Sequence, residues 1–424
     1  MTSDRNARLR RTTAIHLAME GEEMLRKIEE FPDNPVAMGY FYELFRARSK
    51  GEGLKTEGSK VVGTLCVQVP DELIRACGAR PLRLCSGAQA HESVGAELMP
   101  AKSCPLVKAT LGMLEAGGPI EELCGIVVPA TCDQKRKMAS LLAGRGYPVH
   151  LLEMPPMKAS EGARFYWQES VKELALTLEK WTGVRLTRKA VQAAIRERAR
   201  ASREFRRLYA LQRSLPAPLA GKDLLLVANS FFFDDSDRWQ QAVATLCTEL
   251  EARVERGQGA GGKLAPRILF TGSPPIVPNL KVPVLAEEAG AVIVADELCS
   301  SARLLHDQPI IGEGTLADML PALADRALKP CTCPCLADNR DRERRLLSLA
   351  DDYQVDGVIY QAFSGCMPYE LEQRQIGAVL AAKGIPMLYV ETDYSPEDMG
   401  QLSTRVEAFL ESIRSRKHQK GVKA

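Results

Sequence analysis

Long hydrophobic runs are absent from this chain of 424 residues. Every apolar stretch falls far short of the roughly 20 residues that a membrane-spanning helix needs. The start of the chain, from Met1 to Arg8, also lacks the apolar segment of a signal peptide. We therefore expect a cytoplasmic protein without a membrane partner.

An excess of charge of one sign is also absent. Lys and Arg together number 56 and Asp and Glu 54, so the formal net charge is +2, whereas nucleic-acid-binding domains are usually strongly basic. The Arg-dense stretch 196–207 is interrupted by Glu197 and Glu204 and has no aromatic platform. This pattern favours a solvated helix face over an RNA-binding surface, and we expect no nucleic-acid partner.

The motifs of common hydrolases and nucleotide-binding proteins are missing. The chain has no HExxH, no GxSxG and no P-loop GxxxxGK(S/T), and it contains only five histidines. The glycine-rich segment 257–262 follows a helical pattern rather than a strand, so it is typical of a flexible linker and not of a dinucleotide-binding loop. Any ATP-driven step would therefore have to occur on a partner protein.

Cysteine, in contrast, is abundant. The chain has 12 cysteines, and thiols of a protein without a secretion signal stay reduced, so clustered ones more often bind metal or do redox chemistry. Three of them have counterparts later in the chain at nearly the same spacing. Cys66 and Cys132 lie 66 residues apart, and Cys299 and Cys366 lie 67 residues apart. This repeated spacing indicates a duplicated unit that holds thiolates for an iron–sulfur centre. Its members are Cys66, Cys104, Cys132, Cys299, Cys335 and Cys366.

The local sequence around several of these cysteines favours ionised sulfur. Cys132 and Cys366 each follow a β-rich apolar run, and Cys104 precedes a proline at a position suited to a helix N-terminus. The carboxyl ends of parallel strands bind ligands, and a helix N-terminus stabilises a thiolate. Iron–sulfur clusters need such ligands. The alternative is a set of unrelated packed thiols, since free cysteine is among the most buried residue types.

The segment Cys331-Thr-Cys-Pro-Cys335 is the densest group of cysteines. A structural zinc site is an alternative, but it usually shows paired CxxC or Cys/His spacings, which are not found here. Cys335 corresponds to Cys104 in the internal repeat, and we prefer it as the ligand of the second half. Cys333 fits the repeat almost as well.

The order of apolar runs predicts an α/β fold with two Rossmann-like, parallel-sheet domains and a cluster between them. We expect an N-terminal helical cap at 1–59, a first α/β domain at 60–155, a helical insertion or bridge with a linker at 156–262, and a second α/β domain at 263–424. A tail from Arg414 is expected to be disordered. The expected strands lie at 61–65, 81–84, 125–129, 148–152, 266–272, 291–295, 357–360 and 386–390.

Several segments together resemble the 2-hydroxyacyl-CoA dehydratase and benzoyl-CoA reductase superfamily, over most of residues 60–412. The double-cubane cluster proteins look like the closest branch. The segments that carry the resemblance are Asp71-Glu-Leu-Ile-Arg-Ala-Cys-Gly-Ala, Cys104-Pro-Leu-Val-Lys, Thr131-Cys-Asp-Gln-Lys-Arg-Lys, Thr271-Gly-Ser-Pro-Pro, Asp296-Glu-Leu-Cys299, Val355-Asp-Gly-Val-Ile-Tyr and Glu391-Thr-Asp-Tyr.

The resemblance implies one of two cofactors. In the dehydratase branch three cysteines hold one [4Fe-4S] cluster, which would carry over onto Cys104, Cys132 and Cys366. In the double-cubane branch six cysteines hold an [8Fe-9S] unit. The spacing of the internal repeat indicates Cys66, Cys299 and Cys335 as the three additional ligands. Members of that branch are homodimers that receive low-potential electrons from an ATP-hydrolysing activator with its own [4Fe-4S] cluster, and they reduce a small molecule.

We therefore predict an oxygen-sensitive iron–sulfur reductase component of anaerobic metabolism, with a 2-hydroxyacyl-CoA dehydratase or aryl-CoA reductase subunit as the alternative. A third hypothesis is an electron carrier or cluster-assembly scaffold that consumes no substrate. Proton donors are expected near the ligands in sequence, although each candidate is otherwise typical of a solvated surface charge. These candidate catalytic residues are Glu297, His91, Lys281 and Asp133.

Overall fold

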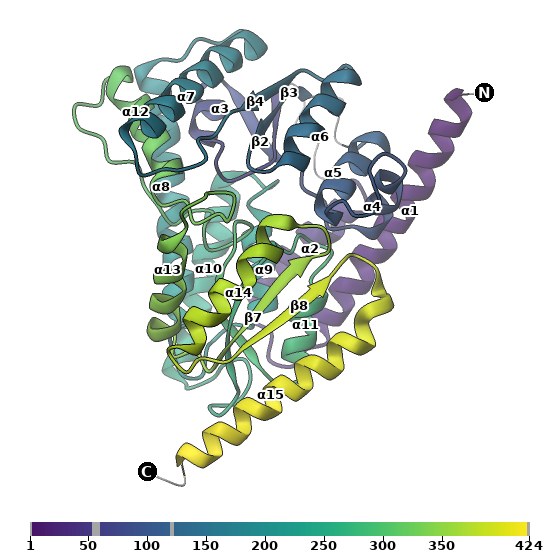
Figure 1. Cartoon of the computed structure of the whole chain (residues 1–424), viewed down its shortest axis with the longest axis vertical. Coiled ribbons are helices and arrows are strands. Elements are labelled where there is room, and N and C mark those ends of the chain that lie inside the picture. Colours follow the sequence, from purple (N-terminus) through teal and green to yellow (C-terminus); the bar gives the residue numbers. More distant parts are fainter. Residues whose placement is uncertain (1, 53–59, 119–122, 422–424) are drawn as a thin grey trace.

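The computed structural model describes residues 2–52, 60–118 and 123–421, and the part of the expected N-terminal cap at 53–59 lies outside them. Two parallel sheets lie one above the other in Figure 1, each with its own helices. None of the helices in the described ranges is both apolar and long enough to cross a membrane.

The first sheet has four parallel strands in the order β2-β1-β3-β4. They are β1 (Lys60–Thr64), β2 (Ala79–Arg83), β3 (Leu123–Pro129) and β4 (Val149–Leu152). Residues 125–129 of β3 are all buried, as expected of a parallel strand covered on both faces. The helices of this lobe are α3 (Asp71–Ala76), α4 (Gln89–Ala96), α5 (Pro105–Glu115) and α6 (Asp133–Gly144).

The second sheet repeats this topology, with four parallel strands in the order β6-β5-β7-β8. They are β5 (Arg267–Gly272), β6 (Val292–Glu297), β7 (Gly357–Phe363) and β8 (Met387–Thr392). In each sheet the first strand of the repeat lies between the second and the third. The prediction of two Rossmann-like α/β units is confirmed, and so is the duplication that the cysteine spacing indicated.

Helices cover the second sheet on both sides. They are α11 (Lys281–Glu288), α13 (Arg340–Asp352), α14 (Met367–Ala381), the short η2 (Pro396–Asp398) and α15 (Met399–Gly421). The expected disorder after Arg414 is wrong as far as Gly421, because α15 continues as a helix. Arg414 donates to the carbonyl oxygen of Ala289 at 2.6 Å, and Lys417 pairs with Asp356 at 2.6 Å.

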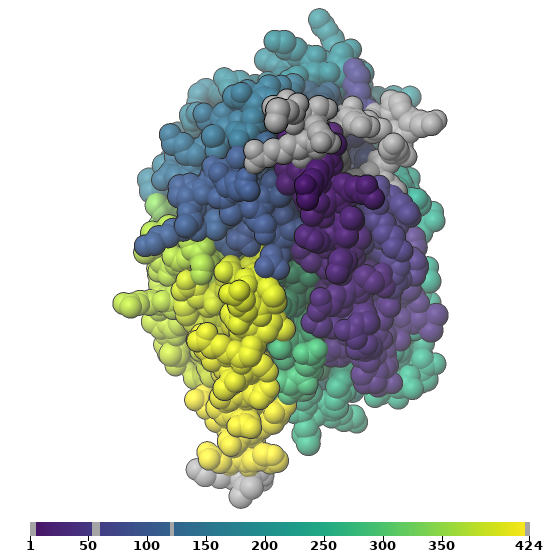
Figure 2. All heavy atoms as spheres, turned by 90° about the vertical axis from the view of Figure 1, so that its right-hand side faces the viewer, coloured from purple at the N-terminus to yellow at the C-terminus, as the bar shows by residue number. Residues whose placement is uncertain are grey.

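The segment between the sheets is helical, as predicted. It forms α7 (Glu161–Thr182), α8 (Arg188–Leu211), α9 (Gly221–Ser230) and α10 (Ser236–Glu255). The N-caps of α7 and α8 are side chains of the kind that start helices, because Ser160 accepts from the backbone of Ala163 and Thr187 from that of Ala190. The N-terminal cap is α1 (Thr2–Glu29), η1 (Val36–Met38) and α2 (Gly39–Ser49). Figure 2 shows α1 and α15 exposed on the same face.

One helix of the second half crosses to the first lobe. Helix α12 (Leu316–Leu328) packs against α7, and Met319 and Leu323 are buried in the hydrophobic core that contains Val62 and Val127 of the first sheet. The Trp167 indole also donates to the carbonyl oxygen of Ala324 at 2.7 Å. Helix α12 therefore ends close to the boundary between the lobes, shortly before Cys331.

The two lobes meet in close backbone contacts. Gly365, which follows β7, has φ +79°, and a Cβ there would lie 2.1 Å from the carbonyl oxygen of Lys102 in the first lobe. A Cβ on Gly87 would lie 1.6 Å from the carbonyl oxygen of Ile276 in the second lobe. Only glycine leaves room for these approaches.

Replacing Gly365 with alanine should reduce the free energy of unfolding by about 3 kcal/mol, because a left-handed φ and a clash with backbone act together. Gly384→Ala is the matched control, since Gly384 has φ +71° but nothing within 4 Å of the added Cβ. The control should lose only about 1 kcal/mol. Urea denaturation measures both variants, and equal losses would show that the contact between the lobes is not tight.

Candidate functional site

Cysteines lie just beyond the carboxyl ends of strands in both sheets. Cys66 follows β1, Cys132 follows β3, Cys299 follows β6 and Cys366 follows β7. Because all strands of a parallel sheet end at the same edge, each sheet presents its cysteines on one side. These edges face the boundary between the lobes, where loops of the two halves contact each other.

Three cysteines form what we call the first cysteine group: Cys104, Cys132 and Cys366. They are the N-cap residues of α5, α6 and α14, and each is therefore next to the positive end of a helix. The thiol of Cys366 donates a hydrogen bond to the sulfur of Cys104, which lowers the pKa of Cys104 and raises that of Cys366. Burial raises the pKa of Cys132, and the neighbouring Cys366 adds to this rise. Sulfurs from both lobes thus come together.

Gln134 links the backbone on both sides of the first cysteine group. Its side-chain oxygen accepts from the backbone N–H of Cys104 at 2.8 Å, and its side-chain nitrogen donates to the carbonyl oxygen of Gly365 at 2.8 Å. On the second-lobe side, the hydroxyl of Ser273 contacts Cys366 and works to lower its pKa. The loops that carry these sulfurs are therefore fixed by hydrogen bonds as well as by packing.

Five further cysteines form the second cysteine group: Cys66, Cys299, Cys331, Cys333 and Cys335. Within it the thiol of Cys335 donates to the sulfur of Cys333, which lowers the pKa of Cys333 to about 6 and raises that of Cys335. Burial raises the pKa values of Cys299 and Cys331 to about 12. Cys66 is close enough that its charge would raise the pKa values of Cys299, Cys331 and Cys335 further.

The two groups are neighbours. A charge on Cys333 of the second group raises the pKa of Cys132 in the first. Lys135, one turn after Cys132, lies beside both groups and donates to the carbonyl oxygen of Leu65 at 2.9 Å. Burial works to lower the pKa of Lys135, but Cys66, Cys85, Cys132 and Cys299 raise it more, so the amine stays charged. All six cysteines of the predicted set thus lie in one region of the molecule.

Sequence reasoning missed Cys85. It lies near Cys66 and Lys135, and burial raises the pKa of its thiol. A signal was present in the sequence, because Leu65-Cys66, Leu84-Cys85 and Leu298-Cys299 stand at the same offset after the ends of β1, β2 and β6. The repeat that relates the two halves of the chain does not include this third Leu-Cys pair, Leu84-Cys85.

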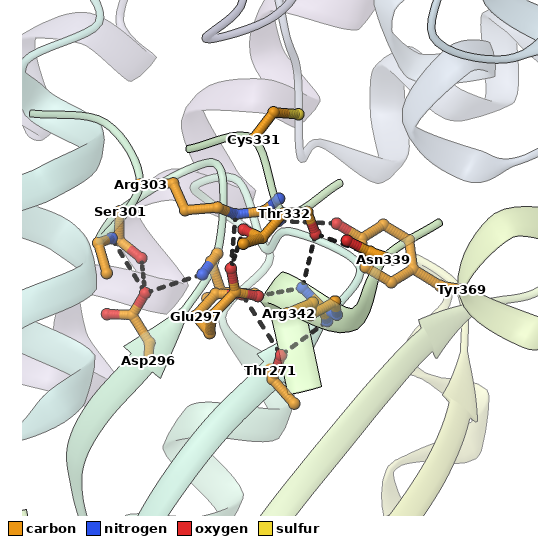
Figure 3. Close-up of polar contacts among 12 residues, drawn as sticks. Thr271, Asp296, Glu297, Ser301, Arg303, Cys331, Thr332, Asn339, Arg342 and Tyr369 are labelled. Carbon is orange, nitrogen blue, oxygen red and sulfur yellow. Dashed lines mark hydrogen bonds and ion pairs between the residues drawn. The ribbon is translucent and has the colours of Figure 1, made fainter. Parts of the chain in front are cut away.

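Glu297 is buried behind the second cysteine group (Figure 3). Its carboxylate forms ion pairs with Arg342 and with Arg303, and the distance to the guanidinium of Arg303 is 3.2 Å. It also accepts a hydrogen bond from the hydroxyl of Thr332 at 2.5 Å. Thr332 lies between Cys331 and Cys333, so Glu297 fixes the loop that carries them. The guanidinium of Arg303 lies near Cys299 and Cys333, where its charge favours their ionised forms.

Asp296, the neighbour of Glu297 on β6, fixes the loop that carries Cys299. Its carboxylate accepts from the backbone N–H groups of Leu298 at 3.2 Å and Ala302 at 3.1 Å, and from the hydroxyl of Tyr209 at 2.5 Å. The hydroxyl of Ser301 donates to it as well (Figure 3). Adjacent carboxylates thus hold the two loops of the second cysteine group.

The other predicted proton donors have different surroundings. His91 is buried, its Nδ1 lies 2.7 Å from the hydroxyl of Ser86, and burial lowers its pKa to about 4. Lys281 donates to the carbonyl oxygen of Ser395 at 2.6 Å and pairs with Asp398 at 2.5 Å. The side chain of Asp133 is 94% exposed at the start of α6.

Across the described ranges, no group of three or more His, Cys, Asp and Glu side chains is arranged as the ligands of a single metal ion. A four-iron cluster makes a different demand, since each of its cysteines binds a different iron and the sulfurs lie around the cluster rather than around one ion. Soft thiolate donors are the ligands that such clusters take. The two cysteine groups therefore fit iron–sulfur clusters by chemistry and by clustering.

Replacing Glu297 with glutamine should reduce the free energy of unfolding by about 3–5 kcal/mol, because it leaves two buried guanidinium groups without their shared carboxylate. The exposed Asp133 offers a control, and Asp133→Asn should change stability by about 0.5 kcal/mol or less. Chemical denaturation of both variants tests this. A mild effect of Glu297→Gln would show that the carboxylate is not the anchor of the cysteine loop.

Comparison with known proteins identifies the chain's relatives. Residues 66–413 match the family described as 2-hydroxyglutaryl-CoA dehydratase, D-component. A putative dehydratase subunit, YjiM, of Escherichia coli is 33% identical over 85% of this chain and 93% of that protein. The beta subunit of (R)-2-hydroxyglutaryl-CoA dehydratase of Acidaminococcus fermentans is 26% identical over 85% and 94% of the two chains, and one of the subunits of the benzoyl-CoA reductase of Thauera aromatica is 22% identical over 84% and 91%. This chain belongs to the 2-hydroxyglutaryl-CoA dehydratase D-component family, within the 2-hydroxyacyl-CoA dehydratase and benzoyl-CoA reductase superfamily.

Proposed function

We propose that this protein is an iron–sulfur reductase component that binds a double-cubane [8Fe-9S] cluster and reduces a small molecule. The observation that carries the proposal is the presence of two neighbouring cysteine groups rather than one. Cys104, Cys132 and Cys366 would hold one cubane, and Cys66, Cys299 and Cys335 the other. Cys333 is the alternative to Cys335, because the two sulfurs are hydrogen-bonded to each other.

The charges around the two groups support this assignment. Cluster-bound thiolates bring several negative charges to a partly buried place, and these need positive neighbours. Lys135 lies beside both groups, Arg303 lies beside Cys299 and Cys333, and the N-termini of α5, α6 and α14 adjoin the first group. When bound, the cluster would supply one-electron transfer at low potential.

The chain's own residues would position this chemistry. Gln134 holds the backbone on both sides of the first group, and Glu297 holds Arg303 and Thr332 beside the second. Glu297, His91 and Lys281 remain our candidates for proton transfer. Glu297 has the most direct connection to a cysteine loop, through Thr332.

Electrons would come from a separate ATP-hydrolysing activator with its own [4Fe-4S] cluster, and we propose a homodimer for the protein itself. Two findings support a partner of this kind. The relatives named above are subunits of dehydratases and of a reductase, so related chains work within assemblies. The sequence of this chain also has no P-loop of its own.

The names of the relatives also support a second candidate, a 2-hydroxyacyl-CoA dehydratase subunit with one [4Fe-4S] cluster. In that case Cys104, Cys132 and Cys366 would be the ligands, and the second cysteine group would remain as thiols. Iron content separates the two candidates, because the double cubane contains twice the iron.

Anaerobic purification followed by iron and sulfide analysis should give about eight irons per chain for the double cubane and about four for the dehydratase cluster. Single alanine variants at Cys66 and Cys299 should lower the iron content only if the second group binds a cluster. Alanine at Cys335 and at Cys333, in separate variants, identifies the third ligand. Cys247→Ala is the control, since Cys247 is buried on α10 and belongs to neither group.

An iron content of about four that is insensitive to Cys66 and Cys299 would establish the dehydratase alternative. Protein without iron and sulfide after anaerobic purification would exclude both candidates.

A further inference from the structure

A cavity of about 80 Å³ lies between the N-terminal cap and the boundary of the two lobes. Its walls come from α1 and α2, from the loop after β2, from the end of α9 and from residues 276–278 of the second lobe. Cys85 is part of the wall, so the cavity adjoins the region of the second cysteine group. His91, one of the candidates for proton transfer, also lines the cavity, but no ligand has been assigned to it.

Two arginines line the cavity without an ion pair to any carboxylate in the described ranges. The first is Arg48, whose guanidinium lies 5.8 Å from the centre of the Phe233 ring. Arg83 lies 4.9 Å from the centre of the Phe232 ring, contacts Cys85, and has a buried Nε without a hydrogen-bond partner among the residues that the structure describes. Aromatic faces offset only part of the cost of removing a cation from water.

Several other arginines of this protein are paired with carboxylates, while the buried Arg267 donates to backbone carbonyl oxygens instead. Arg198 and Arg326 share Glu72, and Arg303 and Arg342 share Glu297. The cavity lining, in contrast, contains neither Asp nor Glu from the described part of the chain. An acidic residue on α1, Glu20, is bound to the backbone N–H groups of Gln89 and Ala90 instead.

Charge in the cavity therefore comes from the two arginines. His91 also lines it, but burial and the nearby Arg48 lower its pKa to about 4, so the ring is neutral at pH 7. Burial and the nearby Arg80 also lower the pKa of Arg48, to about 10, which still leaves it protonated at pH 7. A bound anion would supply the negative charge that the described lining of the cavity lacks.

We propose that this cavity binds a short-chain monocarboxylate, with its carboxylate between Arg48 and Arg83. A planar guanidinium matches the two oxygens of a carboxylate. The remaining walls are largely apolar, with Met24, Phe45 and Met113 among them, which favours a ligand with a hydrocarbon end over inorganic phosphate.

The volume limits the size of the ligand. Scaled from an engineered cavity of about 150 Å³ that holds benzene, 80 Å³ accommodates about three or four non-hydrogen atoms. Acetate has this size, whereas a coenzyme A thioester does not fit. The arginines are placed by α2 and β2 and are not among the proposed cluster ligands, so this site stands whether or not the protein binds a double cubane.

Thermal unfolding of the anaerobically purified full-length protein tests the site, with acetate as the probe and with sodium chloride keeping the ionic strength constant. Acetate should raise the melting temperature in a saturable way, by about 2 °C at ten times its dissociation constant. Acetamide, which has the same shape without the charge, should have no effect. Equal shifts with acetate, acetamide and chloride would overturn the proposal.

Arg48→Gln and, separately, Arg83→Gln should weaken acetate binding about tenfold or more. Arg48→Gln should also raise the melting temperature of the ligand-free protein, because it removes a half-buried charge that has no carboxylate partner in the described ranges; a purely structural arginine would have the opposite effect. Lys50→Gln is the matched control, since Lys50 is an exposed cation next to α2 and is not part of the cavity wall. Acetate binding by both arginine variants at the level of the control would refute the site, and iron content, measured in parallel, reports on the cluster separately.

Discussion

The concentration of cysteine sulfur where the two lobes meet is the constraint on which the rest of this structure depends. Ionised sulfurs repel one another, and burial disfavours each of them, as the raised pKa values of Cys132, Cys299 and Cys331 show. Lys135 and Arg303 supply fixed positive charge at two sides of the sulfurs. Both cations are held in place by the protein, Lys135 by the carbonyl oxygen of Leu65 and Arg303 by Glu297.

Much of the fold could be predicted because parallel strands covered on both faces leave a clear signal. All eight strands of the two sheets overlap the apolar runs found in the sequence, and the fully buried β5, β6 and β7 contain continuous apolar runs. The tail after Arg414 was misjudged because its charged composition resembles disorder. Its order depends on contacts with Ala289 and Asp356, which are distant in sequence.

The candidate site was only partly predictable for the same reason. Strand ends and helix starts indicated which cysteines could converge, and the structure brings those six into one region. Arg303 was not found, because nothing in its local sequence distinguishes it from a surface charge. Glu297 was chosen by its position beside Cys299, but its partner Arg342 lies 45 residues away and became visible only in three dimensions.

Each of the two cysteine groups contains sulfurs from both halves of the chain. The first group takes Cys104 and Cys132 from the first lobe and Cys366 from the second. The second group takes most of its sulfurs from the second half of the chain and Cys66 from the first lobe. Any movement that separates the lobes would therefore disturb both groups at once. The close contacts of Gly365 with Lys102 and of Gly87 with Ile276 oppose such a movement, which explains why glycine is needed beside the sulfurs and not only in distant turns. A boundary held in this way would suit the electron transfer proposed above, because a cluster whose ligands do not rearrange would gain or lose an electron with little cost in reorganisation.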